Sequence, residues 1–290
     1  MKVSNLFNSK FTAAAAALGF GYYYSMKNPT FALENYGFLK SGATLRPHPK
    51  KEYKGGEDSF IIKQRMISVA DGVGGWAKRG VDVAKYSKQL MGLIGEAYDN
   101  NPNSTPKEIL TDAYGKTTEL GSTTVIIAIL DPNNQKLCTT LMGDSSYMIL
   151  RPHDPRAPYK LNKIYRSSEQ QHYFNCPYQC GPTKDHPYKG VDEVHNIKHN
   201  DIVIAATDGI WDNVFDDQII SVIKEEVNND GNLNDPQKAS QKIAKIAFDQ
   251  SHDKEFESPF QINSIASKSK NYYGGKKDDI TVIVSQVKLD

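Results

Sequence analysis

Cysteine is scarce in this chain, which holds only Cys138, Cys176 and Cys180 in 290 residues. An odd and sparse set of cysteines excludes a small domain held together by disulfides and favours a reducing compartment. The net charge of +1 at neutral pH gives no electrostatic reason to expect nucleic acid as the main partner. The hydrophobic fraction of 39% and the charged fraction of 24% are ordinary for a soluble globular protein.

Acidic residues are missing from the first 33 positions, which carry three lysines and several hydroxyl residues before Glu34. Such a start predicts that residues 1–30 are a mitochondrial presequence that directs the protein to the matrix. The alternatives are a membrane anchor over residues 11–26 and, third, a secretory signal, and a disordered tail also stays open. The apolar run over residues 11–24 is shorter than the about 20 residues that a membrane-spanning helix needs.

No long linker divides the chain after this start, so residues 36–290 are predicted to form one domain. A capping box from Thr105 to Glu108, with proline at the first helical position, predicts the start of one helix. Strand-rich segments flank pairs of helical patterns along the domain. This order predicts an α+β fold in which two sheets pack together with helices outside.

The individual elements follow from apolar periodicity. The predicted order is a hairpin over 60–70, helices over 81–99 and 105–118, strands over 123–130, 136–142 and 147–151, a buried strand over 201–206, helices after Asp216 and Asp235, and a last strand over 280–285. Residues 152–200 and 254–277 are predicted to be irregular, because polar residues and turn formers replace the apolar period there.

Acidic residues recur where predicted strands begin or end, often beside a glycine. They are, in chain order, Glu57, Asp58, Asp71, Asp144, Asp208, Asp278 and Asp279. One Asp-Gly pair after a strand is usually a turn, but five such sites together favour a shared function. Carboxylates that converge at buried strand ends repel one another unless cations are present. Hard oxygen ligands select Mg²⁺ or Mn²⁺, and two such ions can activate a water and clamp a phosphoryl oxygen.

The order of these motifs resembles that of the metal-dependent PPM-type (type 2C) Ser/Thr phosphatases. The motifs are Gly56-Glu-Asp-Ser59, Val69-Ala-Asp-Gly-Val-Gly-Gly75, Gly121-Ser-Thr-Thr124, Gly143-Asp-Ser-Ser146, Ala206-Thr-Asp-Gly-Ile-Trp-Asp212 and Asp278-Asp-Ile-Thr-Val282. The resemblance covers residues 36–290 and implies a four-layer αββα sandwich, two antiparallel β-sheets flanked by helices. Gly74-Gly75-Trp76 and the segment from His172 to Gln179 are similar to the mitochondrial branch of the family, which implies mitochondrial substrates.

The resemblance also implies a role for each acidic residue. Asp71 matches the position that bridges two metal ions. The other implied metal ligands are the carbonyl of Gly72 and the carboxylates of Glu57, Asp58, Asp208, Asp278 and Asp279, the last at a position that is usually Asn. Asp144 and Asp208 match a weaker third metal site, and Asp212 matches a carboxylate that hydrogen-bonds metal-bound water. The implied catalytic residues are Asp58, Asp71 and Asp208, acting with two Mg²⁺ or Mn²⁺ ions.

Two positions depart from the family pattern. Val73 stands where many members carry a His that is a candidate general acid, and losing such a group costs about 10²–10⁴-fold where it operates. Tyr53 stands where many members carry an Arg that holds the phosphate. Lys54, Lys78 or Arg79 are candidate replacements, with solvated surface cations as the alternative.

The expected protein is a monomer that hydrolyses phosphoserine and phosphothreonine in proteins by direct attack of water. The two departures motivate a rival hypothesis, a catalytically silent binding scaffold. A two-metal nuclease is a third interpretation, but the chain lacks the basic surface that nucleic acid binding needs.

Overall fold

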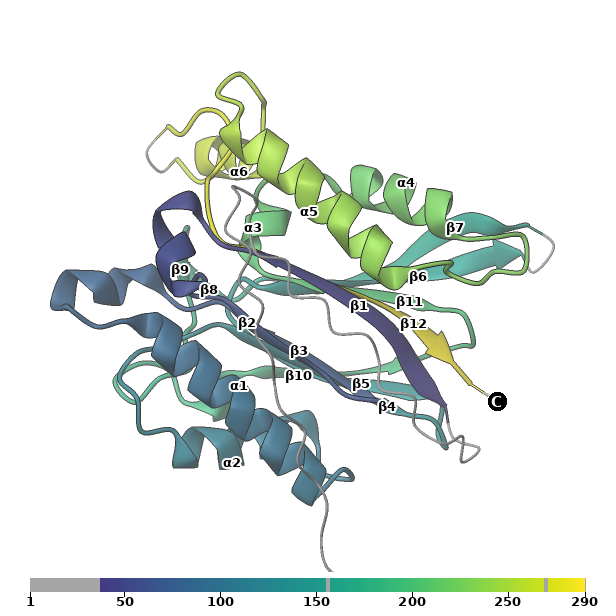
Figure 1. Cartoon of the computed structure of the whole chain (residues 1–290), viewed down its shortest axis with the longest axis horizontal. Helices are drawn as coiled ribbons and strands as arrows, with labels where there is room; N and C mark the ends of the chain where they lie inside the picture. Colours follow the sequence, from purple (N-terminus) through teal and green to yellow (C-terminus); the bar gives the residue numbers. More distant parts are fainter. Residues whose placement is uncertain (1–36, 155–156, 269–270, 290) are drawn as a thin grey trace, which may run out of the picture.

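The computed structural model describes residues 37–154, 157–268 and 271–289. Two five-stranded antiparallel sheets stack face to face, and helices cover the outer face of each sheet (Figure 1). The predicted four-layer αββα sandwich is therefore confirmed. The predicted presequence or anchor over residues 1–30 lies outside the described residues. Among the described helices, none combines the length and the apolar character needed to cross a membrane.

The first sheet joins the two ends of the described chain. Its strands, in spatial order, are β1 (Phe38–Arg46), β12 (Ile280–Lys288), β11 (Ile202–Ala206), β6 (Ser146–Asp154) and β7 (Ala157–Arg166). Its outer face is covered by α4 (Asp216–Glu226) and α5 (Pro236–His252). β12 pairs with β1 along all nine residues of each, so the first and last strands of the domain lie side by side.

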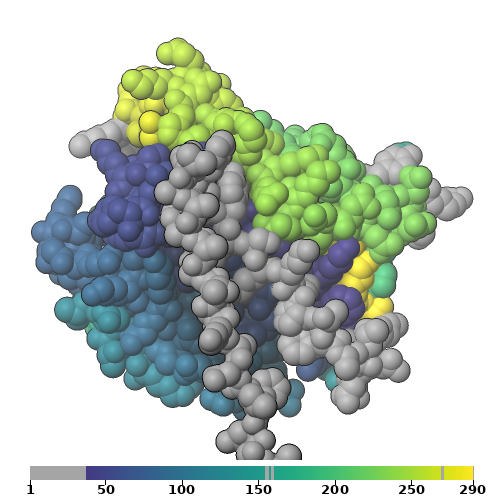
Figure 2. Space-filling model, in the orientation of Figure 1, coloured from purple at the N-terminus to yellow at the C-terminus, as the bar shows by residue number. Residues whose placement is uncertain are grey.

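The second sheet is built from the middle of the chain. Its strands, in spatial order, are β10 (Val191–Asn196), β5 (Lys136–Met142), β4 (Val125–Asp131), β3 (Met66–Ala70) and β2 (Ser59–Ile62). Its outer face is covered by α1 (Val83–Asn100) and α2 (Pro106–Lys116). The capping box predicted at Thr105 is present. In Figure 2 the blue part of the surface, which belongs to the region of α1 and α2, lies below the green part, which belongs to the region of α4 and α5.

The central strands are buried on both faces, which explains their continuous apolar sequences. Every residue of β3 and β11 is buried. One apolar layer fills the space between the two sheets. One further layer lies between each sheet and the helices that cover it, which makes three layers in all. Strands of this kind hold their ends rigidly, since neither face can move without opening a packed core.

The prediction of irregular structure was wrong for parts of two segments. Residues 152–200 contain β7 and β10, and also β8 (Gln171–Tyr173), β9 (Cys176–Pro177) and the short 3₁₀ helix η3 (Pro187–Lys189). Residues 254–277 contain α6 (Pro259–Ala266), which Ser258 caps. The strand β10 lies at a sheet edge, where its apolar residues Val191 and Val194 are 43% and 63% exposed. Because these residues do not face a core, the sequence of β10 lacks the alternation of apolar and polar residues that marks a half-buried strand.

Candidate metal centre

Several strand ends meet at one edge of the sandwich. In the first sheet, Ala206 at the end of β11 lies opposite Val282 near the start of β12 and Ser146 at the start of β6. In the second sheet, Ala70 at the end of β3 lies opposite Ser59 at the start of β2. The end of an antiparallel strand and the start of its neighbour share an edge. The acidic residues beside these ends are thereby brought together, namely Asp58, Asp71, Asp144, Asp208 and Asp278.

Asp71 lies at the centre of this carboxylate cluster. Burial raises the pKa of Asp71 well above its usual range. Repulsion raises it further and comes from the carboxylates of Asp58, Asp208, Asp278 and Asp144. The backbone carbonyl of Asp71 accepts hydrogen bonds from the Thr124 N–H at 2.9 Å and the Thr123 hydroxyl at 2.6 Å. The side chain is therefore held in place by its backbone while its charge is opposed.

Asp58 is fully buried, and only one of its two carboxylate oxygens accepts hydrogen bonds. Its Oδ2 accepts hydrogen bonds from the hydroxyls of Thr207 at 2.9 Å and Thr281 at 2.7 Å, which tie the two sheets together. Its Oδ1 has no partner, and Asp208 Oδ1 is buried and unpartnered as well. Burial and repulsion from Asp279 raise the pKa of Asp58, although the two hydroxyls oppose the rise. A buried carboxylate oxygen without a donor is unfavourable, so both oxygens fit a bound cation.

Lys276 stands on one side of the cluster, in the loop before β12. Its Nζ lies 2.5 Å from Asp208 Oδ2, 2.7 Å from Asp212 Oδ2 and 3.3 Å from Asp278 Oδ2. Burial raises the pKa of Asp212 to about 8, even though Lys276 acts to lower it. Burial would also raise the pKa of Asp278, but Lys276 and Lys51 outweigh it and lower that pKa.

Glu57 and Asp279 are committed to the loop that precedes β2. Asp279 accepts hydrogen bonds from the backbone N–H of His48 at 2.6 Å, from that of Glu57 at 3.0 Å and from Lys51 Nζ at 2.9 Å. The Glu57 carboxylate is paired with Lys51 at 2.7 Å and with Lys54 at 2.8 Å. Both side chains thus have cationic partners from the short 3₁₀ helix η1 (Pro49–Lys54).

The remaining implied ligands are also buried at this edge. Asp144 is 5% exposed, and burial followed by repulsion from Asp208 raises its pKa. The backbone N–H of Gly72 donates to the carbonyl of Glu57 at 3.2 Å. A Cβ at Gly72 would lie 2.7 Å from that same carbonyl oxygen, so only glycine lets the two loops approach this closely.

The donor set fits Mg²⁺ or Mn²⁺ by its chemistry. Among the described residues, no group of three or more His, Cys, Asp or Glu side chains is arranged to hold a metal ion as it stands. They do contain hard carboxylate oxygens, two of them orphaned and buried, at the edge where carboxylates repel. Lys51 and Lys276 lie among these carboxylates and supply part of the missing positive charge.

The positions that depart from the family pattern lie outside this cluster. Tyr53 is 86% exposed. Val73 lines a small pocket of about 150 Å³ together with Arg79. Lys54 is held by two carboxylates, and Lys78 is exposed. None of these three cations is therefore placed by a described contact to hold a phosphate at Asp71.

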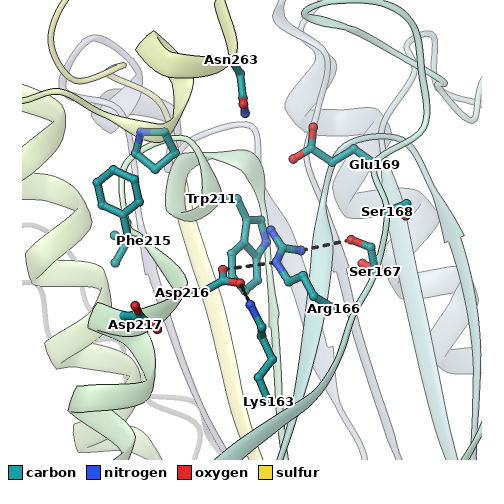
Figure 3. A pocket seen from close by; sticks show the side chains of 12 residues that line it. Lys163, Arg166, Ser167, Ser168, Glu169, Trp211, Phe215, Asp216, Asp217 and Asn263 are labelled. Carbon is teal, nitrogen blue, oxygen red and sulfur yellow. Dashed lines mark hydrogen bonds and ion pairs between the residues drawn. The ribbon is translucent and has the colours of Figure 1, made fainter. Parts of the chain in front are cut away.

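A broad hollow of about 690 Å³ opens beside the cluster (Figure 3). Arg166 at the end of β7 lies 3.6 Å from the centre of the Trp211 ring and contacts the Ser146 hydroxyl. The Trp211 indole N–H donates to the carbonyls of Ser146 at 3.1 Å and Ala206 at 2.9 Å, so it bridges the ends of β6 and β11. Arg166 was not predicted as a site residue, because its strand β7 has no apolar period in the sequence.

We expect the metal-free protein to lose stability as the pH rises. Asp58, Asp71 and Asp144 have folded-state pKa values raised above their unfolded values. Their stabilising contribution is therefore complete below about pH 4 and lost as the pH rises through the folded-state values. The stability of the metal-free protein is measured by thermal unfolding in EDTA at several pH values. The expected Tm falls from acidic to neutral pH, and an excess of Mn²⁺ at neutral pH reverses the fall. A metal-free Tm that rises over the same range contradicts the repulsion.

Comparisons with known proteins agree with the motifs at this edge. The family profile described as "Protein phosphatase 2C" matches residues 185–255. The human protein named "Protein phosphatase PTC7 homolog" is 32% identical over 270 residues, which cover 87% of this chain and 82% of that protein. This chain belongs to the protein phosphatase 2C family. The match extends over nearly the whole region that the resemblance predicted.

Other phosphatase 2C relatives support the same assignment. "Probable protein phosphatase 2C 55" of Arabidopsis thaliana is 38% identical over 255 residues, which cover 86% of this chain. This chain spans only 52% of that relative and 58% of "Probable protein phosphatase 2C 80". The X-ray structure of the photosystem II phosphatase PBCP superposes with a TM-score of 0.75 at 33% identity, over 86% of this chain and 99% of that one.

A more distant structure shares the fold alone. The catalytic domain of the phosphatase PstP superposes with a TM-score of 0.59 at 15% identity, over 88% of this chain and 100% of that one. That structure is described as a complex with two manganese ions.

Proposed function

We propose that this chain is a protein serine/threonine phosphatase that hydrolyses phosphoserine and phosphothreonine with two Mg²⁺ or Mn²⁺ ions. The convergence of buried carboxylates on Asp71 is the observation that carries the proposal. Family membership and the manganese-bound fold relative support it. When bound, the ions supply Lewis acidity and lower the pKa of the attacking water.

The proposed metal ligands are the carboxylates of Asp58, Asp71, Asp208 and Asp278 and the carbonyl of Gly72. The hydrogen bonds from Thr207 and Thr281 orient Asp58 so that Oδ1 is left for an ion. Of the adjacent pair before β12, Asp278 is the better ligand, because the oxygens of Asp279 already hold the loop before β2. Glu57 and Asp279 then position ligands and do not themselves bind a metal.

The hollow beside the cluster is the proposed site for the residues that flank the phosphorylated side chain. It carries charges of both signs, with Lys163 paired to Asp216 at 2.8 Å and Glu169 on the side of Arg166 (Figure 3). Mixed charge suits a polar peptide in extended conformation. Trp211, which joins the ends of β6 and β11, lines the hollow.

We propose that the protein is located in mitochondria, most favourably in the matrix. The acid-free start over residues 1–30 supports a cleaved presequence before the phosphatase domain over residues 36–290. The proposed substrates are therefore phosphorylated mitochondrial proteins, acted on by a monomer, and a membrane anchor over residues 11–26 is the alternative.

Turnover of a phosphothreonine peptide by the full chain tests the function. The protein is stripped with EDTA, and the release of inorganic phosphate is measured as Mn²⁺ or Mg²⁺ is added. We expect no turnover without a divalent ion and rapid turnover with one, with a phosphotyrosine peptide as the matched negative control. Absence of turnover at every concentration of both ions refutes the enzyme and favours the binding scaffold.

A further inference from the structure

The ammonium of Lys276 is paired with Asp208, one of the two carboxylates at which a third metal ion is implied, and its charge also acts on the other, Asp144. That ion was expected beside Asp144 and Asp208. We propose that the Lys276 ammonium is the resident third cation of this centre, so that the protein binds two divalent ions and not three. The inference rests on the proposed function only for the presence of the two ions.

The contacts of the ammonium match its hydrogen-bonding capacity. An ammonium group has three N–H donors, and Lys276 Nζ has three carboxylate neighbours, in Asp208, Asp212 and Asp278. The two short contacts, 2.5 Å and 2.7 Å, are to the Oδ2 atoms of Asp208 and Asp212. The lysine side chain is only 15% exposed. The Oδ2 atoms of Asp208 and Asp212 are therefore not free for a metal ion.

The division of the two Asp208 oxygens supports this arrangement. Oδ2 is taken by the lysine, while Oδ1 is buried without a partner. Asp58 Oδ1 is unpartnered in the same way. The oxygens left for ions thus belong to the two-ion site, and the ammonium repels any further cation on the Asp212 side.

The backbone of Lys276 is fixed independently of these charges. The buried amide of Asn213 donates to the carbonyl of Lys276 at 2.8 Å and accepts from its N–H at 2.8 Å. A Cβ at Gly275 would lie 1.9 Å from the carbonyl oxygen of Gln250, so the loop lies directly against α5. The ammonium is therefore presented to the cluster by a rigid support and is not a surface lysine that happens to be near.

Counting bound ions tests the proposal. Native mass spectrometry of the full chain with excess Mn²⁺ is expected to find two ions in the wild type, three in K276M and two in K276R, which keeps the charge. The matched control is K277M, the exposed neighbour in the same loop, which is expected to bind two. Three ions in the wild type, or two in K276M with unchanged affinity by calorimetry, overturn the proposal.

A second measurement follows the metal-free protein. Removing the ammonium leaves buried carboxylates uncompensated, so the metal-free Tm of K276M is expected to fall by roughly 5–15 °C, and Mn²⁺ is expected to restore most of it. An unchanged metal-free Tm overturns the proposal. If K276M does not fold, the same two readouts are taken on K276Q, and the wild-type ion count still decides. Two bound ions without phosphopeptide turnover would refute the proposed function and leave the role of Lys276 intact.

Discussion

The D71N variant is expected to lower kcat/KM for a phosphothreonine peptide by at least about 10³-fold in saturating Mn²⁺, a loss of roughly 4 kcal/mol of transition-state stabilisation. Asp71 is the residue on which the other carboxylates converge, so its charge is the one that two ions would share. Asn keeps the shape of the side chain and removes the charge. Steady-state kinetics with the peptide measures the effect.

The loss is separable from unfolding because stability is expected to change in the opposite direction. Removing a repelled, half-buried charge relieves the cluster, so metal-free D71N is expected to have a higher Tm than the metal-free wild type at neutral pH. D249N makes the same chemical change at an exposed position of α5 and is expected to leave activity unchanged. Turnover by D71N near the wild-type rate would show that the site is assigned wrongly.

The G209A variant is expected to lower stability and activity together. A Cβ on Gly209 would lie 1.9 Å from the carbonyl oxygen of Asp279. A contact this short forces the backbone at Gly209 and the backbone at Asp279 apart. The turn α3 (Asp208–Trp211) would then move away from the start of β12 and separate Asp208 from Asp278. Overpacking of this kind costs roughly 1–3 kcal/mol or more, which lowers the Tm by roughly 2–12 °C.

Gly92 provides the matched control for that change. It lies on an exposed face of α1, and a Cβ there meets nothing within 4 Å. G92A is expected to be neutral or to stabilise the protein by about 0.5–1 kcal/mol, since alanine favours a helix. Thermal unfolding and phosphopeptide kinetics on both variants compare the two sites. Wild-type stability and activity in G209A would contradict the close approach of α3 and β12.

The clustering of Asp71 and Asp208 was predictable because buried strands mark their own ends in the sequence. The runs before Asp71 and Asp208 are apolar on both faces, so each acidic residue stands out where the run stops. The antiparallel register then places such ends on a common edge. Exposed elements leave no such mark, which is why the edge strand β10 and the strand β7 were not predicted.

The position of Lys276 in the cluster was not predictable by the same argument. Lys276 and Lys277 are neighbours in a polar loop, and no local pattern distinguishes them. In the structure one is buried against three carboxylates and the other is exposed. Asp278 and Asp279 are likewise adjacent, yet only Asp279 is taken up by the loop before β2. Such differences arise from tertiary contacts between segments that are far apart in sequence.

The most direct test of the two-metal centre is anomalous diffraction from crystals of the protein grown with Mn²⁺. The carboxylate cluster predicts two anomalous peaks about 3.5–4 Å apart, both within coordination distance of the Asp71 carboxylate. Absence of any peak within coordination distance of Asp71 in crystals that hold manganese elsewhere would contradict it.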